Sequence, residues 1–110
     1  MQTLVSAPWL EDFLTQQMPL SQAMQVTVLA VSEESVLLSA PLGPNLNHHA
    51  TVFGGSACAV AMLAAWSLLY VRLRPAFPAV SIVIQRQRMT YQRPMQGSFA
   101  ARARLADPAD

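Results

Sequence analysis

The sequence lacks the features that mark several common protein classes. Its 110 residues contain one cysteine, Cys58, which excludes an internal disulfide and favours a reducing compartment such as the cytoplasm. Charged residues make up only 12% of the chain and the net charge is +1, with no dense basic cluster, so a nucleic-acid partner is not expected. No basic segment precedes an apolar one near the N-terminus, so we expect no signal peptide.

The sequence also lacks a hydrophobic run long enough to cross a membrane. Its most apolar stretch, residues 57–71, is shorter than the roughly 20 residues of a spanning helix and is interrupted by Ser67. A buried helix within a folded domain is therefore expected, without a membrane span. The 53% hydrophobic content argues against disorder, and the length predicts one small domain over residues 1–110. Scarce charge favours a second apolar surface, such as an interface in a homo-oligomer.

The first element that the pattern predicts is a helix near the N-terminus. Ser6 is a suitable N-cap, Pro8 falls in the first turn, and Glu11 and Asp12 follow near the positive end of the helix dipole. Apolar residues recur at helical spacing, and Pro19 ends the helix. The residues on this predicted apolar face are Leu10, Phe13, Leu14 and Met18.

Four strands and a second helix complete the predicted α+β organisation. Residues 25–32 and 36–40 form a predicted hairpin, and residues 79–93 give a long strand signal. Residues 98–105 alternate between apolar and arginine side chains, as a half-buried strand does. A helix over residues 55–73 lies between these pairs and is apolar nearly all round, which predicts burial on most sides. One stripe of this helix is small (Ala57, Ala61, Ala64, Leu68) and another is bulky (Leu63, Trp66, Tyr70).

The most informative segment of the chain is the loop that leads into this helix. Residues 44–56 read Pro-Asn-Leu-Asn-His-His-Ala-Thr-Val-Phe-Gly-Gly-Ser. Two glycines allow backbone N–H groups to approach a ligand, and a helix start offers unpaired N–H groups and a positive dipole end. This arrangement suits a phosphate, a carboxylate or a developing oxyanion. A tight turn into a buried helix explains the same residues, and the pattern alone does not separate the two interpretations.

The run from Asn47 to Ser56, followed by a long alanine-rich helix, resembles the central loop and helix of hotdog-fold thioesterases. It is most similar to the thioesterase domain that forms the C-terminal part of some bacterial acetyltransferases, the YiiD C-terminal type. The resemblance is strongest over residues 44–72 and continues more loosely over 82–105. It implies a hotdog-like α+β domain in which a curved antiparallel sheet wraps a long central helix. Because such domains usually continue with at least one more strand, either this sequence is a shortened domain or the fold is a reduced version that lacks the last strand or strands.

The resemblance also implies an activity, the hydrolysis of an acyl-CoA or another acyl thioester, without a metal or a cofactor. Backbone N–H groups of Gly55 and Ser56 match the position that holds the carbonyl oxygen, and Asn47 matches the loop residue that orients water or substrate. The carboxylate usually found two turns into the helix is missing, since Met62 falls near its place. Of the two histidines, His49 is the candidate base, because a histidine side chain can accept a proton in catalysis. The remaining candidate substrate-binding residues are His48, Thr51, Phe53 and Gly54.

Other interpretations stay open at this point. The chain could be a non-catalytic acyl-binding or dimerisation module associated with an acetyltransferase. A hotdog dehydratase is disfavoured because its Asp–His pairing is not visible. The adjacent histidines lack a third ligand and the spacing of a metal site. Cys58 is better explained as a small core thiol than as a nucleophile. The arginines, which supply all seven basic residues, suit either the phosphates of coenzyme A or an ordinary strand surface.

Overall fold

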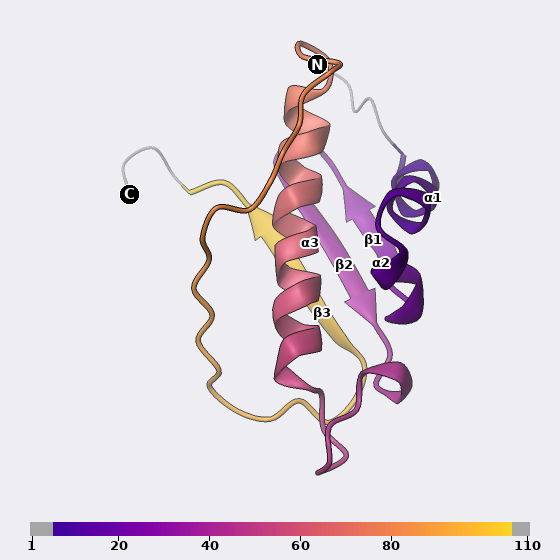
Figure 1. Cartoon of the computed structure of the whole chain (residues 1–110), viewed down its shortest axis with the longest axis vertical. Helices are drawn as coiled ribbons and strands as arrows, with labels where there is room; N and C mark the ends of the chain where they lie inside the picture. Colours follow the sequence, from indigo (N-terminus) through magenta and orange to yellow (C-terminus); the bar gives the residue numbers. More distant parts are fainter. Residues whose placement is uncertain (1–5, 107–110) are drawn as a thin grey trace.

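The computed structural model describes residues 6–106 and shows an α+β domain (Figure 1). Three antiparallel strands form one sheet in the order β1-β2-β3. The long helix α3 lies across one face of this sheet, and α1 and α2 lie beside its β1 edge (Figure 1). The elements in chain order are α1 (Ala7–Gln17), α2 (Pro19–Ala23), β1 (Thr27–Val31), β2 (Ser35–Ala40), the 3-10 helix η1 (Gly43–Asn45), α3 (Gly54–Leu73) and β3 (Phe99–Arg104).

The N-terminal helix forms where the sequence predicts it. The Ser6 hydroxyl accepts a hydrogen bond from the N–H of Trp9 at 3.3 Å, which confirms the predicted cap. The predicted role of Glu11 and Asp12 near the positive end is wrong, because no acidic residue lies in the first turn. Glu11 instead accepts a hydrogen bond from the N–H of Val28 at 2.8 Å and so ties α1 to β1. Pro19 ends α1 as predicted, and it also begins α2.

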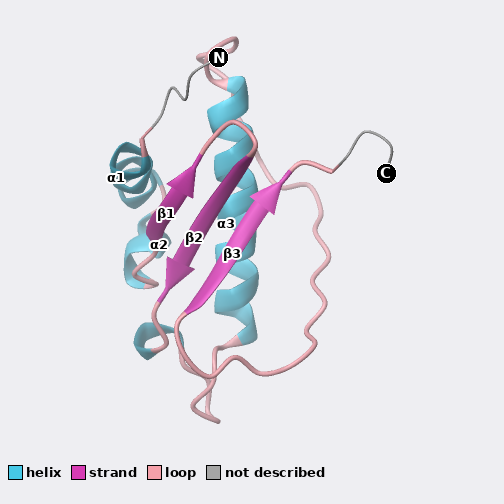
Figure 2. Cartoon of the chain, turned by 180° about the vertical axis from the view of Figure 1, so that it is seen from behind, coloured by secondary structure: helices cyan, strands magenta, loops and turns pink. Residues whose placement is uncertain are grey.

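The sheet confirms the predicted hairpin and the predicted last strand (Figure 2). β1 and β2 pair antiparallel with a bulge between Val28 and Ala30, and β2 pairs antiparallel with β3 so that Ala40 faces Phe99. In β3 the side chains alternate, with Phe99 buried and both strand arginines, Arg102 and Arg104, exposed. One face of the sheet is therefore available to pack against α3.

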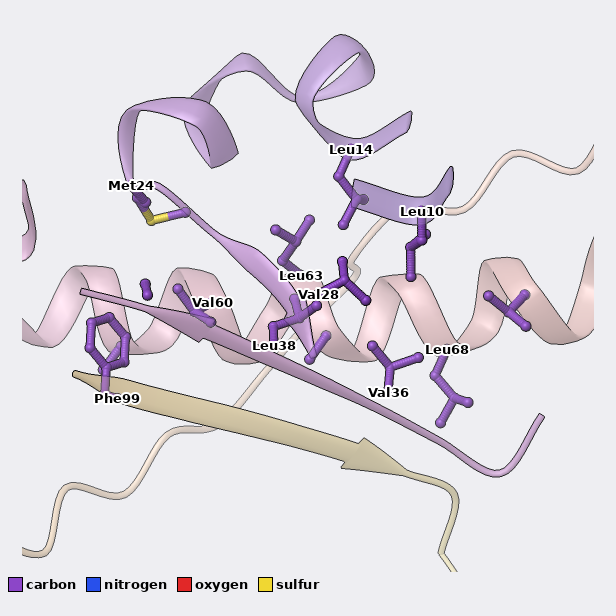
Figure 3. Close-up of a cluster of buried hydrophobic side chains, with 14 of the residues drawn as sticks. Leu10, Leu14, Met24, Val28, Val36, Leu38, Val60, Leu63, Leu68 and Phe99 are labelled. Carbon is purple, nitrogen blue, oxygen red and sulfur yellow. The ribbon is translucent and has the colours of Figure 1, made fainter. Parts of the chain in front are cut away.

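The core lies between the sheet, one face of α3 and α1 (Figure 3). The small stripe predicted in α3 faces inward, since Ala57, Ala64 and Leu68 are buried. Burial of α3 on most sides is a wrong prediction for the single chain, because only seven of its 20 residues are buried and they share one face. Fully buried side chains from the other elements complete the core, among them Leu10, Leu14, Val36 and Leu38.

The bulky stripe of α3 packs against α1 through stacked aromatic rings. Phe13 lies 4.7 Å from Tyr70 and 6.3 Å from Trp66, measured between ring centroids. Trp9 stacks on Phe13 at 5.0 Å, and the Arg74 guanidinium lies 4.8 Å above the Trp9 ring. These contacts join α1 to the C-terminal half of α3.

The predicted strand over residues 79–93 is the main point at which the structure differs from the sequence expectation. This segment is extended and runs back alongside α3 in the opposite direction (Figure 1), but it forms no strand. Among the described residues, the sheet ends at β3 and the backbone of residues 81–92 joins no ladder. A β-strand requires a neighbour for its N–H and C=O groups, so strand propensity alone leaves this segment as extended chain.

By length and composition, α3 could cross a membrane, and it is the single helix of the described residues that passes this test. The helix extends beyond residues 57–71 at both ends, and the expectation of a chain without a membrane span is not contradicted. Its buried face packs on the sheet, as the core helix of a folded domain does.

Candidate functional site

The candidate site is centred on the first turn of α3. The helix begins at Gly54 after an extended N-cap, Phe53, and no side chain caps it. The N–H of Phe53 donates to the carbonyl of Asn45 at 2.7 Å, and the first hydrogen bond of the helix runs from Ala57 N–H to the Phe53 carbonyl at 3.0 Å. Within residues 6–106, the N–H groups of Gly54, Gly55 and Ser56 have no partner. A 20-residue helix thus directs its positive end at this point.

The two glycines of the helix start accommodate aromatic rings. Neither has a positive φ, so their conformation does not require glycine. A Cβ at Gly54 would lie 3.4 Å from Cε1 of Tyr91. A Cβ at Gly55 would collide with the Phe53 ring, whose Cζ would be 2.9 Å away. The space beside Gly55 is therefore filled by Phe53 in this structure, so a larger residue at Gly55 would first displace that ring.

The Asn47 side chain organises the loop that precedes the helix. Its Oδ1 accepts hydrogen bonds from the N–H groups of His49 at 2.8 Å and Thr51 at 3.1 Å. Its Nδ2 donates to Thr51 Oγ1 at 2.8 Å and to the Val52 carbonyl at 3.3 Å. Ala50 completes the turn with a left-handed φ of 61°. The amide has four partners within its own loop, so its geometry is that of a residue that positions the loop.

A groove of about 510 Å³ brings part of the predicted site together. Four predicted site residues line it: Asn47, His49, Thr51 and Gly54. The other four, His48, Phe53, Gly55 and Ser56, lie in the same loop and helix start but do not line the groove. The two histidine rings are exposed, with centroids 3.9 Å apart. Within the described chain, no group of three His, Cys, Asp or Glu residues could hold a metal ion.

Two residues outside the predicted set of site residues hold this region in place. Asn45 is 1% exposed, and its Nδ2 donates to the carbonyls of Met24 at 3.0 Å and Pro41 at 2.8 Å. Its own carbonyl receives the N–H of Phe53, so Asn45 connects the helix start to the rest of the domain. The sequence signal for this role is weak, because an asparagine after a proline is typical of any turn.

Tyr91, the second of these residues, joins the extended segment to the helix start. Its hydroxyl donates to the Gly54 carbonyl at 2.9 Å, and its ring lines the groove. Desolvation, and then the charge and hydrogen bond of the nearby Cys58 thiol, raise the pKa of Tyr91 above its usual range. The phenol is therefore protonated at neutral pH and serves as a hydrogen-bond donor. Cys58 is half-buried, and its thiol donates to Gln87 Oε1 at 3.5 Å.

The carboxylates of the described chain lie away from the helix start. Glu11 is hydrogen-bonded to Val28 in β1. The turn containing Glu33 lies beside Arg72, whose Nη1 donates to the Glu33 carbonyl at 2.6 Å. Arg72 is 17 residues beyond Gly55, or about 25 Å along a helix with a rise of 1.5 Å per residue. Neither Glu33 nor its neighbour Glu34 therefore reaches the helix start of its own chain.

Comparisons with known proteins show the family and the fold of the chain. A sequence model of the family described as "Putative thioesterase (yiiD_Cterm)" matches residues 8–110. A protein of unknown function from Chlorobaculum tepidum TLS is 28% identical with a TM-score of 0.84, over 96% of this chain and 67% of its own. The "putative thioesterase" from Shewanella oneidensis is 26% identical with a TM-score of 0.83, over 92% of this chain and 71% of its own.

A third structure extends the likeness in fold alone. A thioesterase from Haemophilus influenzae has a TM-score of 0.81 at 14% identity, over 94% of this chain and 70% of its own. These neighbours have the hotdog fold, and the long helix on an antiparallel sheet in this chain is the same architecture. The predicted fold class is thereby confirmed.

Proposed function

Because the chain belongs to the family described as "Putative thioesterase (yiiD_Cterm)", we propose that it hydrolyses an acyl-CoA thioester at the start of α3. The observation that carries this proposal is the uncapped first turn of a 20-residue helix beside a groove lined by His49, Thr51 and Tyr91. Unpaired N–H groups at a helix start stabilise negative charge on an oxygen atom. When a thioester is attacked, negative charge develops on its carbonyl oxygen, so an oxygen bound at this helix start is stabilised.

In the proposed reaction the carbonyl oxygen of the thioester accepts hydrogen bonds from the N–H groups of Gly55 and Ser56. A water molecule attacks the carbonyl carbon, and His49 accepts a proton from it. The carbon–sulfur bond then breaks, and the proton passes from His49 to the departing thiolate, which leaves a carboxylic acid and a free thiol. Asn47 holds His49 in position through its backbone N–H. The surrounding residues His48, Thr51, Phe53 and Gly54 contact the substrate.

Coenzyme A is the carrier that the groove supports best. Arg93 lines the groove together with His49 and with Gly54, the first residue of α3. A guanidinium matches phosphate geometry with two parallel donors. The phosphates of coenzyme A would therefore lie against Arg93 while the thioester lies at the helix start.

We further propose that the working form is a homo-oligomer in the cytoplasm. Residues 81–92 leave their backbone outside any ladder within the described chain, and Val83 is 83% exposed. Unpaired extended chain with apolar side chains favours pairing with another chain. The single free thiol, Cys58, fits a reducing compartment.

A non-catalytic acyl-binding or dimerisation module, associated with an acetyltransferase, is the second candidate function. Two observations favour it. α3 contains no Asp or Glu, and the hydrogen bonds of the Asn47 amide are all formed within its own loop. In this form the same helix start binds the thioester carbonyl, but no group activates water.

Two substitutions at one position test the site. Ser56→Pro deletes a backbone N–H in the first turn of the helix, where proline is tolerated, while Ser56→Ala keeps the N–H and removes the hydroxyl. Thiol release from a series of acyl-CoA substrates measures turnover. We expect Ser56→Pro to lower kcat by about a hundred- to a thousand-fold, the effect of losing one oxyanion donor, and Ser56→Ala to have a much smaller effect.

The outcomes separate the candidate functions. Circular dichroism and thermal melting establish that both variants fold. A folded Ser56→Pro protein that turns over like wild type places the reaction elsewhere. Wild type that binds acyl-CoA in calorimetry but releases no thiol supports the binding module.

A further inference from the structure

An apolar cavity of about 340 Å³ lies on another side of α3 from the groove. Its walls come from α3, from α2 with the residues on either side of it, and from residues 82–84 of the extended segment. We propose that this cavity holds the acyl chain of the substrate and sets a preference for medium-length chains. The proposal rests on the proposed thioesterase function and adds the substrate class.

The residues that line the cavity favour an apolar ligand. Of the described residues that line it, Ser21 alone is polar, and no lining residue is charged. A charged or strongly polar ligand would therefore lose its hydration without gaining partners. Three of the lining residues are methionines, Met18, Met24 and Met62. Their flexible thioether side chains adapt to an alkyl chain whose length varies.

The cavity and the helix start lie on one face of α3. Gly55, Ala59, Met62 and Trp66 follow the spacing i, i+4, i+7, i+11, which places them in one stripe of an α-helix. The last three of these line the cavity. Ala59 is four residues beyond Gly55, or about 6 Å along the helix axis. A thioester carbonyl bound at the first turn can therefore extend its acyl chain along this face into the cavity.

The near end of this route is narrow and the far end is fixed. The Phe53 ring covers Gly55 at the near end, so this ring has to move aside before an acyl chain can enter the route. At the far end Trp66 Nε1 donates to the Ile82 carbonyl at 2.8 Å, which fixes the wall that residues 82–84 provide. Both ends of the route are built from residues of one chain.

The volume of the cavity gives the expected chain length. A volume of 340 Å³ accommodates roughly ten methylene-sized groups if each takes about the 30 Å³ of a water molecule. Each buried methylene raises affinity roughly four-fold. We therefore expect kcat/KM to rise from acetyl-CoA to about decanoyl-CoA and to rise no further at palmitoyl-CoA.

The test fills the cavity. Ala59→Leu adds three carbon atoms at a position that lines the cavity, and Ala65→Leu makes the same change at an exposed position of the same helix that does not line it. We expect Ala59→Leu to lower the ratio of kcat/KM for decanoyl-CoA to that for butyryl-CoA at least tenfold, because the added carbons displace about three methylenes. Ala65→Leu should keep the wild-type ratio. Met62→Phe serves as a second cavity variant if Ala59→Leu does not fold.

A binding measurement separates failure of this inference from failure of the proposed function. Calorimetric titration of each protein with decanoate reports occupancy of the cavity without hydrolysis. If wild type binds decanoate, Ala59→Leu weakens this binding, and neither protein hydrolyses a thioester, the cavity is an acyl-chain site and the proposed thioesterase activity is wrong. If both proteins hydrolyse thioesters with the same ratio of kcat/KM for decanoyl-CoA to that for butyryl-CoA, the thioesterase activity is supported and the role of the cavity is refuted. Absence of both hydrolysis and decanoate binding in wild type overturns the inference as well.

Discussion

The Tyr91 hydroxyl donates a hydrogen bond to the Gly54 carbonyl at 2.9 Å, so the extended segment is attached to the first residue of the helix that it follows in the chain. A second hydrogen bond, from Trp66 Nε1 to the Ile82 carbonyl at 2.8 Å, attaches the same segment three turns further along α3. Between these two contacts the segment has no ladder partner among the described residues. Side-chain contacts to the helix therefore hold it in place.

The Tyr91 contact predicts a dependence of stability on alkaline pH. Desolvation and the Cys58 thiol raise the pKa of Tyr91 in the folded protein. Its contribution to stability is then fully present below about pH 10, the ordinary phenol pKa, and is lost as pH rises through the folded value. Urea unfolding between pH 8 and pH 11 should show a fall above pH 10 that is smaller in Tyr91→Phe. An identical fall in both proteins would exclude Tyr91 as its source.

Asn45→Ala should destabilise the whole domain. The side chain is 1% exposed and its Nδ2 satisfies the carbonyls of Met24 and Pro41. Leaving these acceptors without a donor should lower the free energy of unfolding by about 2 kcal/mol. Urea denaturation measures the loss. Asn47→Ala in the same loop is the comparison, and because Asn47 is only part-buried it should cost less. Equal losses would contradict the anchoring role of Asn45.

Asn47→Ala should affect turnover more than substrate binding. The Asn47 Oδ1 holds the N–H groups of His49 and Thr51, so its removal misplaces the proposed base. A displacement of this kind lowers kcat by about ten- to a hundred-fold while KM changes little. Asn47→Asp keeps the acceptor oxygen for the N–H groups of His49 and Thr51 and replaces the donor with a charged acceptor, so steady-state kinetics should show a smaller effect than Asn47→Ala. Unchanged kcat in Asn47→Ala would remove this residue from the site.

Local signals were enough to predict most elements of the fold. The cap at Ser6, the two strands around residues 33–34 and the start of α3 each depend on neighbouring residues, and each lies within about two residues of its predicted place. The failures come from partners distant in sequence. Residues 79–93 have strand propensity, yet a strand exists only beside another strand. Glu11 was predicted to interact with the helix dipole, but its carboxylate accepts a hydrogen bond from the N–H of Val28, 17 residues away in the sequence.

The local structure at the start of α3 was predictable from the sequence, but its surroundings were not. The Gly54-Gly55 pair and the preceding polar loop indicate a helix start with unpaired N–H groups, and this follows from the local pattern. The sequence could not show that the Phe53 ring covers Gly55, because ring placement depends on the turn geometry. Nor could it show that Tyr91, 37 residues away, reaches the same point, since the long segment between them has no fixed register.

The extended segment leads to the last prediction, that the protein is not a stable monomer. Residues 81–92 have unpaired backbone within the described chain, and exposed Val83 and Ile84 add apolar surface, so a second copy can supply both a strand and apolar cover. Light scattering coupled to gel filtration should give a mass at least twice the 12.0 kDa of one chain at micromolar concentration.

Gln85→Pro removes one N–H from the segment and should shift the assembly toward monomer, whereas Gln85→Ala keeps that N–H and should not. Dissociation by both variants would point to the side chain as the contact, and a 12.0 kDa species from wild type would refute the prediction. If both variants stay assembled, the copies meet elsewhere, with the exposed edge of β3 as the next surface to substitute.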